Sequence, residues 1–438
     1  MKLHIRSTAA AVAGVLSLTM LGACSGAPDP AATSGGSGKA VTITFWGFVP
    51  KIEESVALFN KTHTDVQVQF ERPADEATMD QKLNAAVTAG SGAPDVVQVA
   101  YQHLNTFVTA GLLEDITKDA APLADAFVPW TWSQSTIGGK VYAIPQDIGP
   151  MAMTYNKAVF EKYNVPIPTT WAEYQTAAAA LHAANPDLYI TAFPSNGGWF
   201  TSLAWQNGAQ WFGTSNDAWD VNIDTKPTQD VANYWQGLLD QGTVKVEADW
   251  SPEWTKDLND GNLATWITAA WGLPTIQSAA PDQAGNWAVA PMPEWTAGTP
   301  AASNWGGSAD SVVTGSKNVA ASVEFTNWLN TDPGSLAILT DPKKGGLFPS
   351  SLAGQKLDSF RAPNPFFGGQ VVTDVFADAA KVVDPNWVWG PTMDQVFSDL
   401  SDNIAAVTSG KGKMDGATTS LQASTVKAIT DKGLSVHK

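Results

Sequence analysis

The chain has 438 residues, a formal net charge of −17 at neutral pH, one cysteine and 19 tryptophans. An acidic protein of this kind repels nucleic acid and anionic lipid surfaces, so we exclude both as its main ligands. No intrachain disulfide can form with a single cysteine, and the length favours two domains or lobes.

The first segment has the composition of an export signal. Two basic residues precede an apolar stretch over residues 9–21, which is too short to span a bilayer comfortably. The sequence LGAC, which ends at Cys24, resembles the lipobox of bacterial lipoproteins, where the chain is cut before a cysteine that carries a lipid. We therefore expect a signal peptide over residues 1–23 and a lipid on Cys24 rather than an ordinary buried thiol. A flexible tether rich in Ala, Gly, Ser and Pro is expected over residues 24–39.

The next part of the chain alternates between strand and helix patterns. Three strands are predicted, over residues 41–46, 66–70 and 94–100. Apolar residues at helical spacing separate them, and this order predicts a parallel α/β sheet. Ligands of such sheets bind beyond the carboxyl ends of the strands. This places Trp46, Tyr101 and Gln102 on one rim.

The segment after this sheet contains two short strand patterns and a strong helix start. A turn at Gly138-Gly139 precedes the strand KVYAIP, residues 140–145, and a second strand is expected over residues 150–156. Thr170 and Glu173 form a capping box, with the threonine at the N-cap and the glutamate at the third helical position. A helix therefore begins at this point.

The remaining chain is rich in Trp, Gly, Asn and Asp. Residues 194–305 are expected to form helices joined by long polar loops, and strand character returns at residues 305–316. The helix predicted over residues 319–330 has an apolar stripe that includes Trp328, which we assign to the core. A last helix is expected over residues 415–429.

Several of these stretches occur together, and in the same order, in one known family. They are TFWGF after the first strand, SGAPDVVQV at the third, AGLLEDIT, GGKVYAIPQDIGPMAMTYNKAVFEKYNVPIPTTWAEY, and WGGSADSVV. On these motifs the chain resembles the extracellular solute-binding proteins of ATP-driven sugar importers, the group similar to maltose-binding protein. The resemblance covers nearly the whole chain after the tether.

The resemblance implies an α/β fold of the periplasmic-binding-protein type, with two lobes, a hinge, and a ligand cleft that closes between the lobes. The N-terminal lobe is expected to comprise residues 40–148 and about 308–355, and the C-terminal lobe residues 149–307 and about 356–438. The chain is expected to cross between the lobes near residues 148–155, 304–310 and 352–365.

Binding of a neutral sugar needs flat aromatic faces together with planar amides and carboxylates. Family position and residue type together give the candidate ligand residues Trp46, Tyr101, Gln102, Asp147, Trp199, Trp271, Trp305, Gly306 and Trp389. The Asp147 carboxylate could accept from two hydroxyls at once, or it could serve a local turn before Gly149. For each tryptophan, a place in the core is the alternative.

Two other functions stay open from the sequence. A glycoside-active enzyme needs two carboxylates about 5 to 9 Å apart, and Asp147 could pair with Asp249, Glu253 or Glu294. A receptor for a peptide, a polyamine or a metal chelate is the second alternative. The histidines show no metal-ligand spacing, and we expect neither a metal nor a cofactor. We therefore expect a lipid-anchored, monomeric, non-enzymatic carbohydrate receptor that serves the permease of an ABC importer.

Overall fold

The computed structural model describes residues 40–74, 76–341 and 346–437. The predicted signal peptide, tether and lipidated Cys24 lie outside the described residues. From Ala40 onward the chain forms one unit of mixed helices and strands. Among the described residues, no helix is both long and apolar enough to cross a membrane.

The first five elements alternate as the sequence predicts. The strand β1 (Val41–Trp46) pairs in parallel with β2 (Val66–Glu71) on one side and β3 (Val96–Ala100) on the other. The helices α1 (Ile52–Thr62) and α2 (Glu76–Thr88) connect these strands. All five residues of β3 are buried, as expected of a central parallel strand. The predicted parallel sheet is confirmed.

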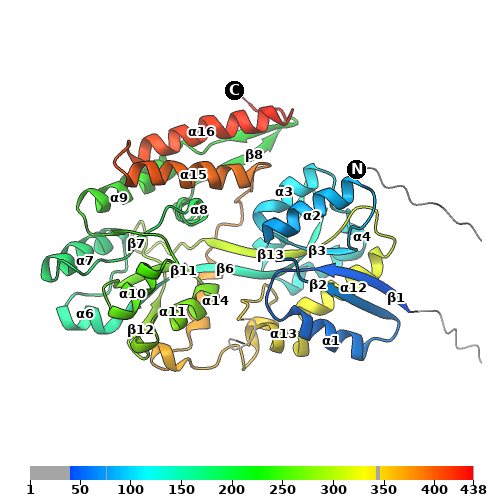
Figure 1. Cartoon of the computed structure of the whole chain (residues 1–438), viewed down its shortest axis with the longest axis horizontal. Helices are drawn as coiled ribbons and strands as arrows, with labels where there is room; N and C mark the ends of the chain where they lie inside the picture. The colour runs from blue at the N-terminus through cyan, green and yellow to red at the C-terminus, as the bar shows by residue number, and fades with distance from the viewer. Residues whose placement is uncertain (1–39, 75, 342–345, 438) are drawn as a thin grey trace, which may run out of the picture. The chain divides into compact units, whose positions relative to one another are not determined.

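Two long strands carry this sheet into the second half of the molecule (Figure 1). The strand β6 (Ala143–Asn156) pairs antiparallel first with β13 (Asn304–Val312), and further along with β11 (Thr265–Ala269) and β12 (Trp287–Ala290). The expectation of two separate strands here is wrong, because β6 is continuous. A residue before proline prefers an extended backbone, so Gly149-Pro150 prolongs the strand instead of ending it.

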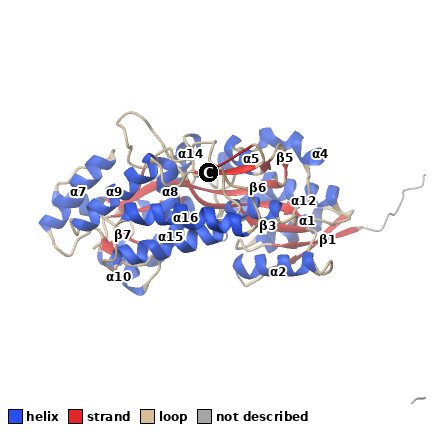
Figure 2. Ribbon diagram, turned by 90° about the horizontal axis from the view of Figure 1, so that it is seen from above, coloured by secondary structure: helices blue, strands red, loops and turns tan. Residues whose placement is uncertain are grey.

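Helices cover both parts of the sheet. The capping box of Thr170 and Glu173 is confirmed at the start of α7. Helices α15 and α16 lie side by side in both views (Figures 1 and 2), and α16 extends the helix predicted near the end of the chain. The helices not yet given bounds are α3 (Tyr101–Thr109), α4 (Thr117–Ala120), α5 (Pro129–Gln134), α6 (Lys157–Tyr163), α7 (Trp171–Ala184), α8 (Gly197–Gln206), α9 (Lys226–Asp240), α10 (Pro252–Asp260), α11 (Leu273–Ala279), α12 (Val319–Thr331), α13 (Pro333–Leu339), α14 (Val372–Lys381), α15 (Met393–Thr408) and α16 (Met414–Asp431).

Three pairs of short strands were not predicted as such. They are β4 (Thr136–Ile137) with β5 (Lys140–Val141), β7 (Ala192–Phe193) with β10 (Lys245–Val246), and the hairpin of β8 (Phe212–Ser215) with β9 (Ala218–Val221). The strands β11 and β12, which each pair with β6, were not predicted either. In the β8–β9 hairpin, Asn216 and Asp217 both have positive φ, as a two-residue turn of this kind requires. The Asn-Asp pair is thus a signal that sequence reasoning could have used.

The core extends under both parts of the sheet. Trp328 on α12 is half-buried and packs edge-on against Phe59, with 5.1 Å between the ring centroids. It belongs to the smaller apolar cluster beside β1, in agreement with its predicted packing role. The residue ranges given above for the two lobes stay a prediction.

Candidate functional site

The two long strands come unusually close where they cross the middle of the molecule. The Asn304 side chain accepts from the Gly149 N–H at 2.7 Å and donates to the Gly306 carbonyl at 2.6 Å. A Cβ on Gly149 would lie 2.9 Å from the carbonyl carbon of Trp305 and closer still to its oxygen. Gly306 and Gly307 both have positive φ, which side-chain-bearing residues rarely adopt. Glycines therefore let the backbone of β13 approach β6 and fix the position of Trp305.

Three tryptophans gather at this crossing. The Trp271 indole donates to the Trp305 carbonyl at 2.7 Å, and the two rings meet edge-on with centroids 4.7 Å apart. The Trp250 ring lies 6.2 Å from Trp271 and 6.3 Å from Trp305. Trp250 is 50 % exposed and has φ of 64°, an outlier for a bulky residue. We call these three residues the tryptophan group; it presents an exposed aromatic face to solvent.

Polar groups border the exposed ring of Trp250. Asp249, Glu247 and Asn196 line a cavity of about 240 Å³ together with Trp250. Burial raises the pKa of Asp249 to about 7, although the Trp266 indole opposes this and Glu247 adds to it. Near neutral pH this carboxyl group can be protonated or ionised, so it can donate a hydrogen bond to a hydroxyl group or accept one from it. The neighbouring amide and indole can also form hydrogen bonds with hydroxyl groups.

Asp147 lies inside β6, and therefore not in the turn that was its alternative role. It is half-buried and accepts a hydrogen bond from the Ser308 hydroxyl on β13. Burial raises the pKa of Asp147 to about 6 against the effect of Ser308, and the nearby Glu76 carboxylate contributes. Tyr101 is buried close by, and burial together with Asp147 raises the pKa of its phenol. The Asp147 carboxylate is thus already engaged in a hydrogen bond within the protein.

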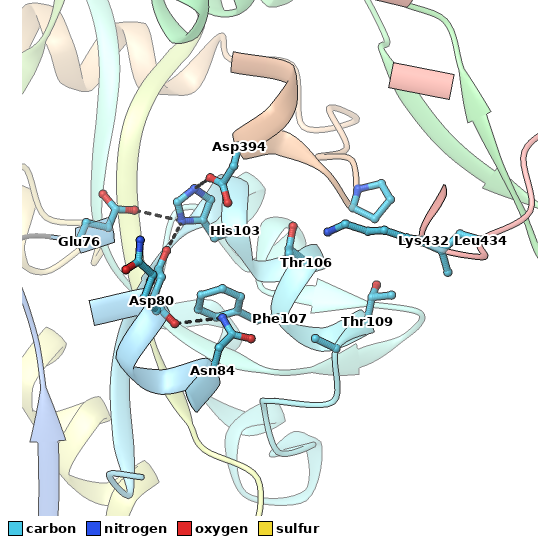
Figure 3. A pocket seen from close by; sticks show the side chains of 13 residues that line it. Glu76, Asp80, Asn84, His103, Thr106, Phe107, Thr109, Asp394, Lys432 and Leu434 are labelled. Carbon is cyan, nitrogen blue, oxygen red and sulfur yellow. Dashed lines mark hydrogen bonds and ion pairs between the residues drawn. The ribbon is translucent and has the colours of Figure 1, made fainter. Parts of the chain in front are cut away.

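A larger cavity of about 1070 Å³ lies between α2 and α3 on one side and the start of α15 with the chain end on the other (Figure 3). His103 lies in its wall between Glu76 and Asp80 on α2 and Asp394 on α15. Burial lowers the pKa of His103, but the carboxylates of Asp394, Asp80 and Glu76 outweigh this and raise it well above its ordinary value. The wall is therefore strongly polar. Its residue Glu76 is also the carboxylate whose negative charge helps to raise the pKa of Asp147.

The other candidate residues from the sequence lie in different surroundings. Trp199 is 2 % exposed, its indole donates to the Ile267 carbonyl at 3.0 Å, and it packs on Trp235. Trp389 is buried against Trp387. The structure thus brings Trp271, Trp305 and Gly306 together and places Trp199 and Trp389 in packed surroundings.

Trp46 and Gln102, two of the three residues predicted on the rim, lie in different surroundings. Trp46 is buried at the end of β1, with the Lys82 ammonium 4.3 Å from its ring centroid. Gln102 is half-buried on α3, next to Tyr101 and His103. Trp250 and His103 were missed as site residues, because the sequence around each offers no signal beyond residue type.

Comparison with known proteins identifies relatives of most of the chain. Residues 45–335 match the family of bacterial extracellular solute-binding proteins. The lactose-binding protein of Rhizobium radiobacter is 24% identical over 387 residues, which cover 84% of this chain and 88% of the relative. The arabinooligosaccharide-binding protein of Bacillus subtilis is 25% identical over 305 residues, 67% of this chain and 70% of the relative.

Solved structures show the same fold. The galacto-N-biose-/lacto-N-biose I-binding protein of the ABC transporter from Bifidobacterium longum, in complex with lacto-N-biose, is 30% identical with a TM-score of 0.81, covering 92% of this chain and 100% of that chain. An ABC transporter associated binding protein from B. animalis subsp. lactis Bl-04, in complex with beta-1,6-galactobiose, is 29% identical with a TM-score of 0.77, covering 91% and 100%. The two-lobe α/β fold expected from the sequence is thereby confirmed.

Proposed function

The chain belongs to the bacterial extracellular solute-binding protein family, and from this premise we propose that it captures a carbohydrate outside the cytoplasmic membrane and delivers it to an ABC importer. The tryptophan group carries the proposal, because a half-exposed indole held in a left-handed backbone beside two others is a surface on which a pyranose can stack. Asp249 and Asn196 border this surface and can bind the hydroxyl groups at the edge of the ring.

The solute is a short oligosaccharide. Relatives that span most of the chain are named for lactose and for arabinooligosaccharide, and the two similar structures hold lacto-N-biose and beta-1,6-galactobiose. The carboxyl and amide groups around Trp250 suit a neutral, hydroxyl-rich ligand. Isothermal titration calorimetry with these four kinds of sugar, and with glucose and maltose for comparison, tests the class. One-to-one binding of at least one of them is expected, and no binding of any sugar would contradict the proposal.

The receptor is held at the membrane by a lipid on Cys24, and it works as a monomer with the importer's permease. The basis is the lipobox-like LGAC sequence and the tether-like composition that follows it. The mass of the mature protein should show a chain that begins at a lipid-modified Cys24. A Cys24→Ala variant should carry no lipid. An unmodified cysteine, or a mature chain that starts elsewhere, would contradict the anchor.

The receptor does no chemistry on its sugar. Its family members are solute-binding proteins, and Asp147 is bonded to Ser308 within the sheet rather than free to act on a glycosidic bond. A bound oligosaccharide should be recovered unchanged after long incubation. Hydrolysis in proportion to the protein, and lost on Asp147→Asn, would instead support the glycosidase alternative.

A further inference from the structure

A cluster of ligand-type atoms lies in the wall of the 1070 Å³ cavity, apart from the tryptophan group. Glu76 and Asp80 lie one turn apart on α2 and face His103 on α3 (Figure 3). The Nδ1 atom of His103 lies 3.2 Å from Glu76 Oε1 and 3.0 Å from Asp80 Oδ2. One ligand atom from each of the three residues lies within 4.8 Å of the other two. Three side chains thus meet around one point.

Apart from their close contacts with one another, these atoms have few partners. Nδ1 of His103 and Oε1 of Glu76 are buried and form no hydrogen bond within the described residues, and the same holds for Oδ1 of Asp80, the oxygen beside the one that faces Nδ1. His103 as a whole is 9 % exposed. Buried polar atoms without hydrogen bonds are costly unless something else binds them.

The far side of the imidazole is oriented by a fourth residue. Asp394, near the start of α15, places Oδ1 2.7 Å from Nε2 of His103. A carboxylate that accepts the N–H of one ring nitrogen leaves the lone pair on the other nitrogen and fixes the ring orientation. This carboxylate–histidine arrangement commonly supports metal-ligating histidines.

We propose that Glu76, Asp80 and His103 bind a divalent transition-metal cation, with Asp394 as the positioning residue. One imidazole nitrogen and two carboxylate oxygens form a ligand set suited to Zn²⁺ or Mn²⁺. Mg²⁺ and Ca²⁺ prefer oxygen ligands alone and should bind more weakly. The cation offsets the negative charge of the carboxylates, which otherwise hold a proton on His103. Three protein ligands leave positions for water or for a hydroxyl in the cavity that these residues line.

The helices explain why the sequence did not reveal this site. Glu76 and Asp80 are separated from His103 by β3, and Asp394 comes from the last third of the chain. Only the packing of α2, α3 and α15 brings them together. The site is independent of sugar stacking on the tryptophan group.

Calorimetric titration of Zn²⁺ into the purified, chelator-treated protein tests the site. One Zn²⁺ per chain is expected to bind. His103→Ala should abolish this binding, and Asp394→Asn should weaken it about 10- to 100-fold, as loss of a supporting carboxylate does. His437→Ala is the matched control, because Nδ1 of His437 also lies 2.7 Å from an aspartate oxygen, on Asp220, but within the part of the chain that the structure describes it belongs to no group of three possible metal ligands. It should leave the affinity unchanged.

A measurement on the unaltered protein guards against a variant that fails to fold. In ¹⁵N spectra of the histidine rings, Zn²⁺ should shift the Nδ1 resonance of His103 more than those of the other histidines. Absence of stoichiometric binding, binding lost with His437→Ala but kept with His103→Ala, or an unchanged His103 spectrum would each overturn the proposal. Sugar binding measured in the presence of chelator tests the proposed function separately, so the two can fail independently.

Discussion

Asp310 on β13 should make the stability of the protein fall as the pH rises. Its side chain is 1 % exposed, and burial raises its pKa to about 8 despite a hydrogen bond from Asn330. The Asn330 and Gln146 amides donate to Oδ2 at 2.7 and 3.1 Å, whereas Oδ1 forms no hydrogen bond within the described residues. The nearby Asp147 carboxylate adds to the increase. The folded protein therefore keeps this carboxyl protonated at neutral pH.

The size of the effect follows from the two pKa values. In the unfolded chain the pKa of an aspartate is about 3.9. Below that pH both the folded and the unfolded state hold the proton, and the contribution of Asp310 to the free energy of unfolding is at its maximum. As the pH rises toward the folded value of about 8, the unfolded state loses the proton first, and stability falls. Where the folded state holds one proton more than the unfolded state, the free energy of unfolding falls by about 1.4 kcal/mol for each pH unit. Between pH 5 and pH 7, Asp310 should lower the free energy of unfolding by about 2.7 kcal/mol.

The assay compares Asp310→Asn with the unaltered protein by urea unfolding at pH 5, 6 and 7. The asparagine keeps the shape and removes the proton, so the two free energies of unfolding should converge, or the variant should become the more stable, as the pH rises. Asp147 and Asp249 also titrate in this range, but both proteins contain them, so the difference reports Asp310 together with its coupling to the nearby Asp147. Asp378→Asn on the surface is the control and should leave the pH dependence unchanged. Parallel pH profiles for Asp310→Asn and the unaltered protein would instead mean that Asp310 titrates alike in the folded and unfolded states.

Two further predictions concern the crossing and the tryptophans. Gly149→Ala should cost about 1–3 kcal/mol of stability and weaken sugar binding, because its Cβ would overlap the Trp305 carbonyl. Thermal unfolding measures the loss of stability and calorimetry the loss of affinity. An unchanged melting temperature would contradict the close approach of the two strands. Gly416→Ala, in the helix α16 with nothing within 4 Å of the added Cβ, should instead keep or raise the stability. Trp199→Ala should cost about 3–5 kcal/mol in urea unfolding, because Trp199 is buried; a small loss would place it outside the core.

The local patterns of the sequence predicted the elements whose partners are near in the chain. The alternation in β1 and β2 and the capping box of α7 depend on neighbouring residues, so they could be read directly. The continuity of β6 could not, because its partners β11, β12 and β13 all come more than a hundred residues later. Pairing with distant strands decides where such a strand ends.

The candidate site was predictable only in part, for a similar reason. Trp271 could be chosen from the sequence because a glycine follows it, and Trp305 because it lies in a predicted crossing between the lobes. The structure brings the two residues into contact. Trp199 follows a glycine pair in the same way, yet its indole packs inward against Trp235. Trp250 owes its exposure to a left-handed backbone, which no residue type around it signals. Exposure and packing of a tryptophan depend on the tertiary structure, so composition alone could not separate these residues.

The most direct test of the account is calorimetric binding of the sugar panel to the unaltered protein and to Trp250→Ala. Trp250 is half-exposed and contributes little to the core, so its loss should leave the melting temperature nearly unchanged. A sugar that binds one-to-one to the unaltered protein should bind the variant at least about twofold to tenfold more weakly, since a stacked aromatic contact contributes about 0.5–1.5 kcal/mol beyond the area that it buries. Full affinity in a well-folded Trp250→Ala variant, or no binding of any sugar by the unaltered protein, would contradict the account.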